Sequence, residues 1–66
     1  MTYVSYTIFE DRDCTIVRSV ANLEGDKAEH ALSVFRRDLG REPKEGDRLH
    51  GVRIDRIGDG LDHYHA

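Results

Sequence analysis

Two histidines one residue apart, His63 and His65, stand in the closing stretch "GDGLDHYHA". A turn at the glycine-rich start of this stretch would fold it back onto the preceding strand. In that pairing Asp55 would share one face of the sheet with both histidines. Two imidazoles and a carboxylate are the ligand set of several metal sites. His63, His65 and Asp55 are therefore weak candidates for metal ligands.

The same pairing also accounts for these residues without a metal. It places Asp62 opposite Arg56 and His63 opposite Asp55, so each polar side chain has a charge-complementary neighbour across the strands. Arg53 on the same face would repel a cation. The pattern therefore favours a polar sheet edge, with no metal and no cofactor.

No catalytic constellation is evident. Cys14 is the single cysteine, and a catalytic cysteine needs an electropositive setting, which Asp13 beside it does not provide. Strand alternation turns Cys14 towards the core, where a free cysteine is commonly buried. His30 and His50 stand near apolar faces, and there is no glycine-rich phosphate loop. We therefore predict that the chain is not an enzyme.

Acidic residues concentrate at the expected turns and element ends. They are Glu10, Asp11, Asp13, Glu24, Asp26, Glu42, Glu45, Asp47, Asp59 and Asp62. Patches of carboxylates at the tips of a sheet can attract a basic surface on a partner. Ordinary solvation of turns by Asp and Glu explains the same distribution. A smaller basic group, Arg36, Arg37 and Arg41, could contact phosphate. Because Asp38, Glu42 and Glu45 are interleaved with it, the pattern favours a solvated surface of mixed charge.

Hydrophobic periodicity predicts the elements that position these residues. Strands with alternating β-branched and aromatic residues are expected over 2–10, 14–20, 48–57 and 61–65. An acidic turn joins the first two strands into a hairpin, and we place Ile8 opposite Ile16. The third and fourth strands would form a second hairpin across the glycine-rich turn.

A helix is expected between the two hairpins. Asp26 and Glu29 have the spacing of a capping box at its start, and Gly40 is the expected residue after its last turn, at Leu39. Its apolar stripe consists of Ala28, Ala31, Leu32, Phe35 and Leu39. The order ββαββ predicts one α+β domain over residues 1–66, with a small antiparallel sheet and the helix packed on one face.

Chain length and composition narrow the function classes. A domain of 66 residues has a core that supplies only about 3–5 kcal/mol, and small domains often add a staple or a partner. A single cysteine excludes a disulfide within the chain and favours a cytoplasmic protein. No apolar run is long enough to cross a membrane. The sheet face away from the helix would expose Tyr3, Phe9 and Val17, which favours a homodimer or another protein partner.

These observations favour a non-enzymatic protein-interaction module. One concrete form is a phage or mobile-element inhibitor of a host nucleic-acid enzyme, of the anti-CRISPR or anti-restriction type, acting by DNA mimicry or steric block. The expected contact residues are Glu10, Asp11, Asp13, Tyr3, Phe9, Val17, Glu42, Glu45 and Asp47. A nucleic-acid-binding accessory protein is an alternative that the net charge of −3 disfavours. A small His/Asp metal-binding protein is a second alternative.

Overall fold

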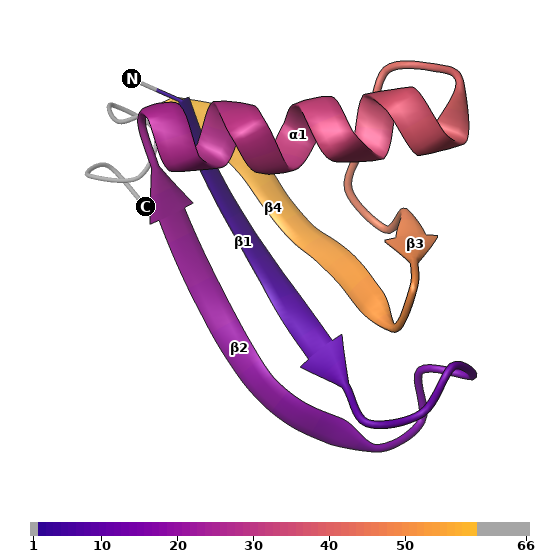
Figure 1. Cartoon of the computed structure of the whole chain (residues 1–66). Helices are drawn as coiled ribbons and strands as arrows, with labels where there is room; N and C mark the ends of the chain where they lie inside the picture. Colours follow the sequence, from indigo (N-terminus) through magenta and orange to yellow (C-terminus); the bar gives the residue numbers. More distant parts are fainter. Residues whose placement is uncertain (1, 60–66) are drawn as a thin grey trace.

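The computed structural model describes residues 2–59 of the chain. Within this range the elements are β1 (Thr2–Phe9), β2 (Val17–Glu24), α1 (Asp26–Leu39), β3 (Arg48–Leu49) and β4 (Val52–Asp59) (Figure 1). The strands form one antiparallel sheet in the order β2-β1-β4-β3. The predicted α+β fold is therefore confirmed. Over residues 2–59, no helix has the length and apolar character needed to cross a membrane.

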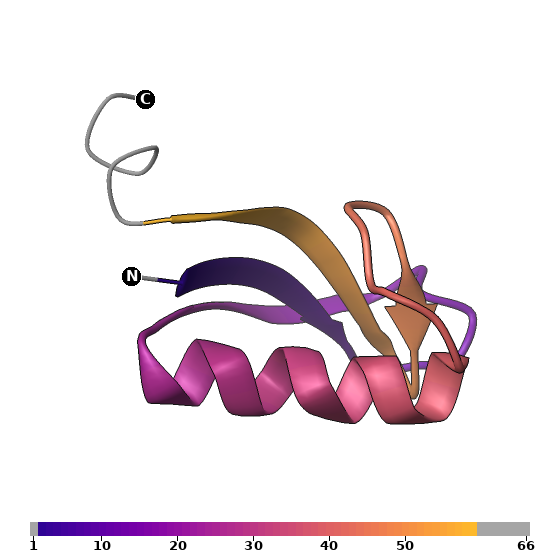
Figure 2. The same cartoon turned by 90° about the horizontal axis from the view of Figure 1, so that it is seen from above.

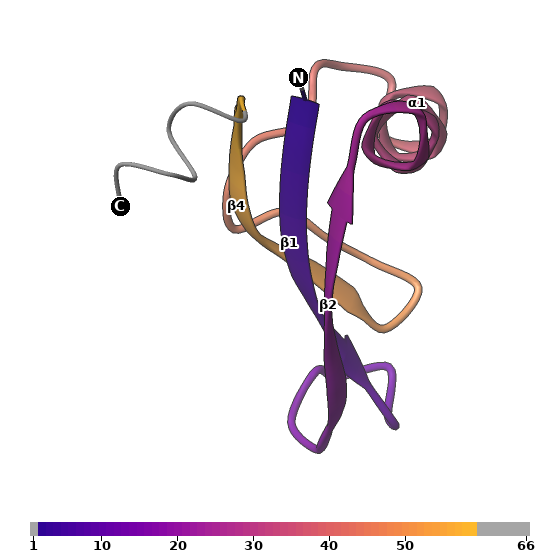
Figure 3. The ribbon, with the colours of Figure 1, turned by 90° about the vertical axis from the view of Figure 1, so that its left-hand side faces the viewer.

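The helix lies along one face of the sheet, and the other face carries no helix in the described part of the chain (Figures 2 and 3). The central strand β1 pairs with β2 on one side and with β4 on the other. Each pairing contains one bulge, and these leave Arg18 and Asp55 as the extra residues. β2 is consequently an edge strand, which pairs with β1 alone among the described elements.

The first hairpin has a different register from the predicted one. Ile8 pairs with Ser19, so the expected pair of Ile8 with Ile16 is wrong. β2 begins only at Val17 and continues to Glu24, through residues that the sequence pattern assigns to a loop. The connection between β1 and β2 is therefore longer than an acidic four-residue turn.

The Asp11 carboxylate explains this longer loop. It accepts hydrogen bonds from the backbone N–H groups of Thr15 and Ile16, at 3.0 and 2.8 Å, and from the Thr15 hydroxyl at 2.5 Å. These bonds, led by the Thr15 hydroxyl, lower the pKa of Asp11 from its ordinary value. Cys14 lies in this loop with a positive φ of 59° and is half-buried, so its predicted place in the core is wrong.

The segment expected to form the third strand, residues 48–57, folds into a second hairpin instead. Leu49 pairs with Val52, and the two residues between them, His50 and Gly51, have φ values of 52° and 75°. Two positive φ values define the type I′ turn, whose twist matches that of the flanking strands. His50 therefore lies in a turn rather than on the apolar side of a strand. The predicted fourth strand, 61–65, lies outside the described residues.

A substitution at Gly51 tests the assignment of the type I′ turn. Replacing it with valine is expected to destabilise the domain by about 1–2 kcal/mol, because a β-branched residue strains at positive φ. A Cβ at this position would meet only ordinary contacts, 3.5 Å from the Phe9 carbonyl oxygen and 3.6 Å from that of Asp11. Urea unfolding measures the loss, and the same substitution at exposed Ser33, in the helix, serves as the control. Equal losses in the two variants would contradict the turn assignment.

The helix begins without the predicted capping box. Gly25 is the N-cap and makes no side-chain cap hydrogen bond, while Asp26 is the first helical residue. The Glu29 carboxylate instead accepts a hydrogen bond from the Thr2 hydroxyl on β1. Both acids still lie in the first turn, where negative charge suits the helix dipole. The predicted end is confirmed, since Gly40 has a φ of 74° and donates its N–H to Arg36.

The core lies between the helix and the sheet. It consists of Val4, Ala28, Leu32, Phe35 and Ile54. The predicted apolar stripe of the helix is thereby confirmed, since its remaining members, Ala31 and Leu39, pack at the edge of this cluster.

Candidate functional site

The sheet face away from the helix does not expose the predicted aromatic surface. Tyr3 and Phe9 retain only 6% and 7% of their accessible surface, whereas Val17 retains 60%. The expectation that both aromatic rings are available to a partner is therefore wrong for residues 3 and 9. Of the three predicted apolar contacts, Val17 alone lies at the surface.

A cluster of polar side chains lies beside Phe9 on the sheet face away from the helix. The Arg53 guanidinium lies over the Phe9 ring, 5.3 Å from its centre. Its Nε donates to Asp55 at 2.8 Å, and the buried Thr7 hydroxyl donates to the other Asp55 oxygen at 2.5 Å. Burial acts to raise the pKa of Asp55, but the hydrogen bonds from Thr7 and Arg53 outweigh it and the net shift is downward.

The proposed metal ligands are not assembled within the described residues. Asp55 is engaged by Thr7 and Arg53, and His63 and His65 lie outside the described range. Residues 2–59 contain no group of three His, Cys, Asp or Glu side chains that could hold a metal ion. The expected Asp55–His63 and Arg56–Asp62 pairs likewise involve residues beyond this range.

Most of the predicted acidic contact residues hold loops in place. Asp47 is buried and accepts two hydrogen bonds from the Arg41 guanidinium, at 2.8 and 2.9 Å, and one from the Lys44 N–H at 2.8 Å. These bonds lower its pKa to about 2. Glu42 binds Arg36 through two hydrogen bonds of 2.9 Å.

The remaining acids differ in how firmly they are held. Glu45 accepts the backbone N–H of Ile57 at 3.1 Å. The carboxylates of Glu10 and Asp13 are exposed and make no hydrogen bond or ion pair within residues 2–59. Of the predicted acidic contacts, Glu10 and Asp13 therefore keep the most freedom to meet a partner.

The basic group at the end of the helix is matched by acids. Arg36 pairs with Glu42, and Arg41 pairs with Asp47. Arg37 Nε lies 3.2 Å from a carboxylate oxygen of Asp38. Each guanidinium thus already has a carboxylate neighbour, which leaves less net positive charge for phosphate contacts.

Exposed apolar side chains gather instead at the start of β2. Ile16, Val17 and Val20 retain 54%, 60% and 68% of their accessible surface. They are the large hydrophobic residues that the structure exposes within residues 2–58. Edge strands usually carry charges or proline that discourage pairing with other chains, so the exposed apolar side chains beside this edge make it a candidate contact surface.

The backbone of β2 also faces outward at alternate residues. Gly25 donates its N–H to the Thr2 carbonyl at 2.8 Å, which fixes the phase of the hydrogen bonds between β1 and β2. In an antiparallel pair every second residue directs its N–H and C=O towards the partner strand. Ala21 and Leu23 therefore face β1, and Val20 and Asn22 present theirs at the free edge.

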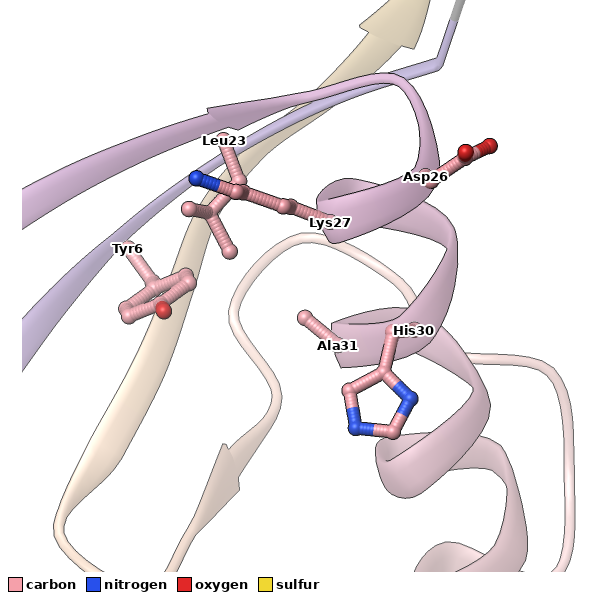
Figure 4. Close-up of a pocket in the computed structure, with 6 residues that line it drawn as sticks. All are labelled: Tyr6, Leu23, Asp26, Lys27, His30 and Ala31. Atoms are coloured by element: carbon pink, nitrogen blue, oxygen red, sulfur yellow. The ribbon is translucent and has the colours of Figure 1, made fainter.

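A groove lies beside this edge on the helix side. It has a volume of about 450 Å³ and is lined by Tyr6, Leu23, Asp26, Lys27, His30 and Ala31 (Figure 4). Tyr6, Leu23 and Ala31 are half-buried and form an apolar floor. Lys27 extends from the helix towards the sheet and Asp26 points away from it (Figure 4). We call this set the β2–α1 groove.

Comparison with known proteins gives no match for the chain. No protein-family model matches it, and no curated protein or solved structure shows significant similarity to it. The inference of function therefore comes from the geometry of β2 and its groove alone.

A second hollow, lined by Arg12, His50 and Gly51, lies at the opposite tip of the sheet and has a volume of about 480 Å³. His50 Nε2 is 3.6 Å from a carboxylate oxygen of Asp38. Among the described residues, the lining of this hollow combines two polar side chains with a glycine and contains no large apolar residue. Binding pockets are usually apolar with a few placed polar groups, so the β2–α1 groove is the better candidate.

Sequence reasoning did not find the β2–α1 groove. Its floor comes from three elements, with Tyr6 on β1, Leu23 on β2 and Ala31 on α1. The segment containing Leu23 reads as a loop because asparagine and glycine flank it. The available signal was the apolar and β-branched alternation that continues through Val20 and Ala21 to Leu23.

Proposed function

We propose that the domain is a non-enzymatic protein-binding module that pairs an extended segment of its partner with β2. The observation that carries this proposal is the exposure of Ile16, Val17 and Val20 at the uncovered edge of the sheet. Addition of a strand to a sheet edge is a recurrent mode of peptide recognition, in which main-chain hydrogen bonds supply affinity. The outward-facing backbone of Val20 and Asn22 supplies those donors and acceptors.

The proposal retains part of the acidic-inhibitor hypothesis. Several of the carboxylates expected to mimic nucleic acid are bound to arginines or to backbone N–H groups, so they are less suited to a primary contact. Glu10 and Asp13 lie in the loop that leads into β2 and are exposed. They can steer a basic partner towards the edge, because charges at the rim of an interface mainly raise the association rate.

Hydrogen exchange on selected binders tests the proposal. Peptides that bind the domain are first selected from a random displayed library. Binding is expected to slow amide exchange at Val20 and Asn22, whose N–H groups face outward, and to change Ala21 little because it already faces β1. Protection confined to the hollow at Arg12 and His50 would contradict the proposal.

A proline substitution in β2 tests the same pairing by removing one backbone donor. Val20→Pro removes one outward N–H, which an edge strand tolerates, and is expected to weaken binding about tenfold through the loss of a hydrogen bond worth roughly 1–1.5 kcal/mol. Val20→Thr keeps the branched shape and the N–H and serves as the control. Circular dichroism verifies that both variants fold, and unchanged affinity in a folded Val20→Pro would count against pairing at β2.

A further inference from the structure

We infer that the β2–α1 groove selects which segment pairs with β2. The preferred partner is an extended acidic peptide that places an apolar side chain in the groove and a carboxylate two residues away, beside Lys27. This inference rests on the proposed strand addition and adds to it the chemistry of the partner.

The position of the groove fits an added strand. Side chains of a strand alternate between the two faces of the sheet, so every second residue of an added strand would point to the helix side. Leu23 and Ala21 of β2 face that side, and the apolar floor of the groove adjoins Leu23. Its volume of about 450 Å³ falls within the range of roughly 300–1,000 Å³ found for ligand pockets.

The charges around the groove favour a carboxylate. Lys27 is exposed and forms no ion pair within residues 2–59, and His30 lies one helical turn further along the same rim. Asp26 also lines the groove, but its carboxylate is directed away from the sheet (Figure 4). Glu24 belongs to the opposite face of the sheet by strand alternation. A carboxylate on the helix side of an added strand therefore meets the Lys27 ammonium group.

A second copy of the chain is the less suitable occupant. Paired along its own β2, a second copy would present Ser19, Ala21 and Leu23 on the helix side. None of these side chains is acidic, so the β2 strand of the copy would bring no carboxylate to Lys27. The charge of the rim thus distinguishes an acidic peptide from self-pairing.

Three synthetic peptides test the inference. Each is a fluorescein-labelled heptapeptide of threonine with a central leucine, and the residues two positions before and after the leucine are both Asp, both Asn or both Lys. This symmetry makes the design independent of strand direction. At low salt the Asp peptide is expected to bind about tenfold more tightly than the Lys peptide, with the Asn peptide between them, when anisotropy is measured. Replacing leucine with glycine is expected to weaken the Asp peptide by a similar factor, because the groove then stays empty.

Charge reversal at the rim gives the matched pair of variants. Lys27→Glu is expected to invert the order of the three peptide affinities, so that the Lys peptide binds best. Lys44→Glu, an equal charge change at an exposed lysine in the loop after the helix, is expected to preserve it. If the Lys27→Glu variant still bound the Asp peptide most tightly, the inference would be overturned. It would also be overturned if none of the three peptides bound the native chain at millimolar concentration.

Amide exchange separates this inference from the proposed function. Protection of Val20 and Asn22 with equal affinity for all three peptides overturns the selection by the groove and leaves strand addition intact. Binding without protection at β2 overturns both. Sedimentation velocity over a concentration series identifies a second copy, and self-association that protects Val20 and Asn22 would assign the edge to that copy instead of an acidic peptide.

Discussion

Replacing Ile54 with alanine is expected to leave a large fraction of the domain unfolded at 25 °C. Ile54 is fully buried and lies in the core with Val4, Leu32 and Phe35. Truncation of a buried isoleucine to alanine costs about 2–5 kcal/mol, whereas a domain of this size has only about 3–5 kcal/mol in total. Circular dichroism and urea unfolding measure the folded fraction.

Two controls show whether the loss arises from the core. Ile54→Val removes a single methylene and is expected to cost about 0.5–1.5 kcal/mol, so that variant remains folded. Ile16→Ala makes the same change as Ile54→Ala at a side chain that retains 54% of its accessible surface, and little loss is expected there. Equal destabilisation by Ile16→Ala and Ile54→Ala would contradict the described core.

Replacing Asp47 with asparagine is expected to lower stability at neutral pH and to flatten the acid side of the stability profile. The folded-state pKa of Asp47 is lowered from 3.8 to about 2, chiefly by hydrogen bonds from Arg41. A group with a depressed folded-state pKa contributes stability above its unfolded pKa and loses it as pH falls through the folded value. The contribution of Asp47 is thus complete at neutral pH and disappears between about pH 4 and pH 2.

Urea midpoints of the native chain and of Asp47→Asn, taken from pH 7 to pH 2, measure this contribution. The difference between the two proteins is expected to be largest at neutral pH and to shrink through the acid window. Taking the difference removes the contributions of other carboxylates with lowered pKa values, such as Asp11 and Glu42. Asp13→Asn makes the same chemical change at an exposed carboxylate, and it should not reproduce the effect. A constant difference at all pH values would contradict the assignment.

The sequence predicts the helix and its buried stripe because their signals are local and agree with one another. Ala28, Leu32 and Phe35 repeat with helical spacing, and Gly40 marks the end of the helix. The fold class follows from the order of the strand-forming and helix-forming segments. These features require no knowledge of which strands pair.

The strand boundaries were mispredicted where side chains determine the backbone. Thr15 and Ile16 are good strand formers, but the Asp11 carboxylate holds both in a loop. Likewise, the run from Arg48 to Ile57 reads as one strand, although histidine followed by glycine suits a turn with two positive φ values. Pattern alone does not weigh these local hydrogen bonds and turns against strand propensity.

The candidate site was only partly predictable. Val17 was an expected contact and lies at the exposed edge, whereas Tyr3 and Phe9 were expected there and are buried. The ring of Phe9 is covered by a residue distant in the sequence, the Arg53 guanidinium on β4, and such a contact cannot be read from a local pattern. The β2–α1 groove likewise exists only after three elements come together, so it requires the tertiary structure.

The placement of β1 between β2 and β4 sets the order in which the molecule can be completed during synthesis. β1 leaves the ribosome before the other described strands, yet one of its two neighbours is the last of them, with Thr2 paired to Asp59. The hairpin of β1 and β2 and the helix can form early from local contacts, but the sheet closes only when β4 has emerged. Until then one edge of β1 is open to pairing with other chains. A nascent chain that ends before Val52 therefore lacks the strand that covers this edge, and its β1 can pair with other chains.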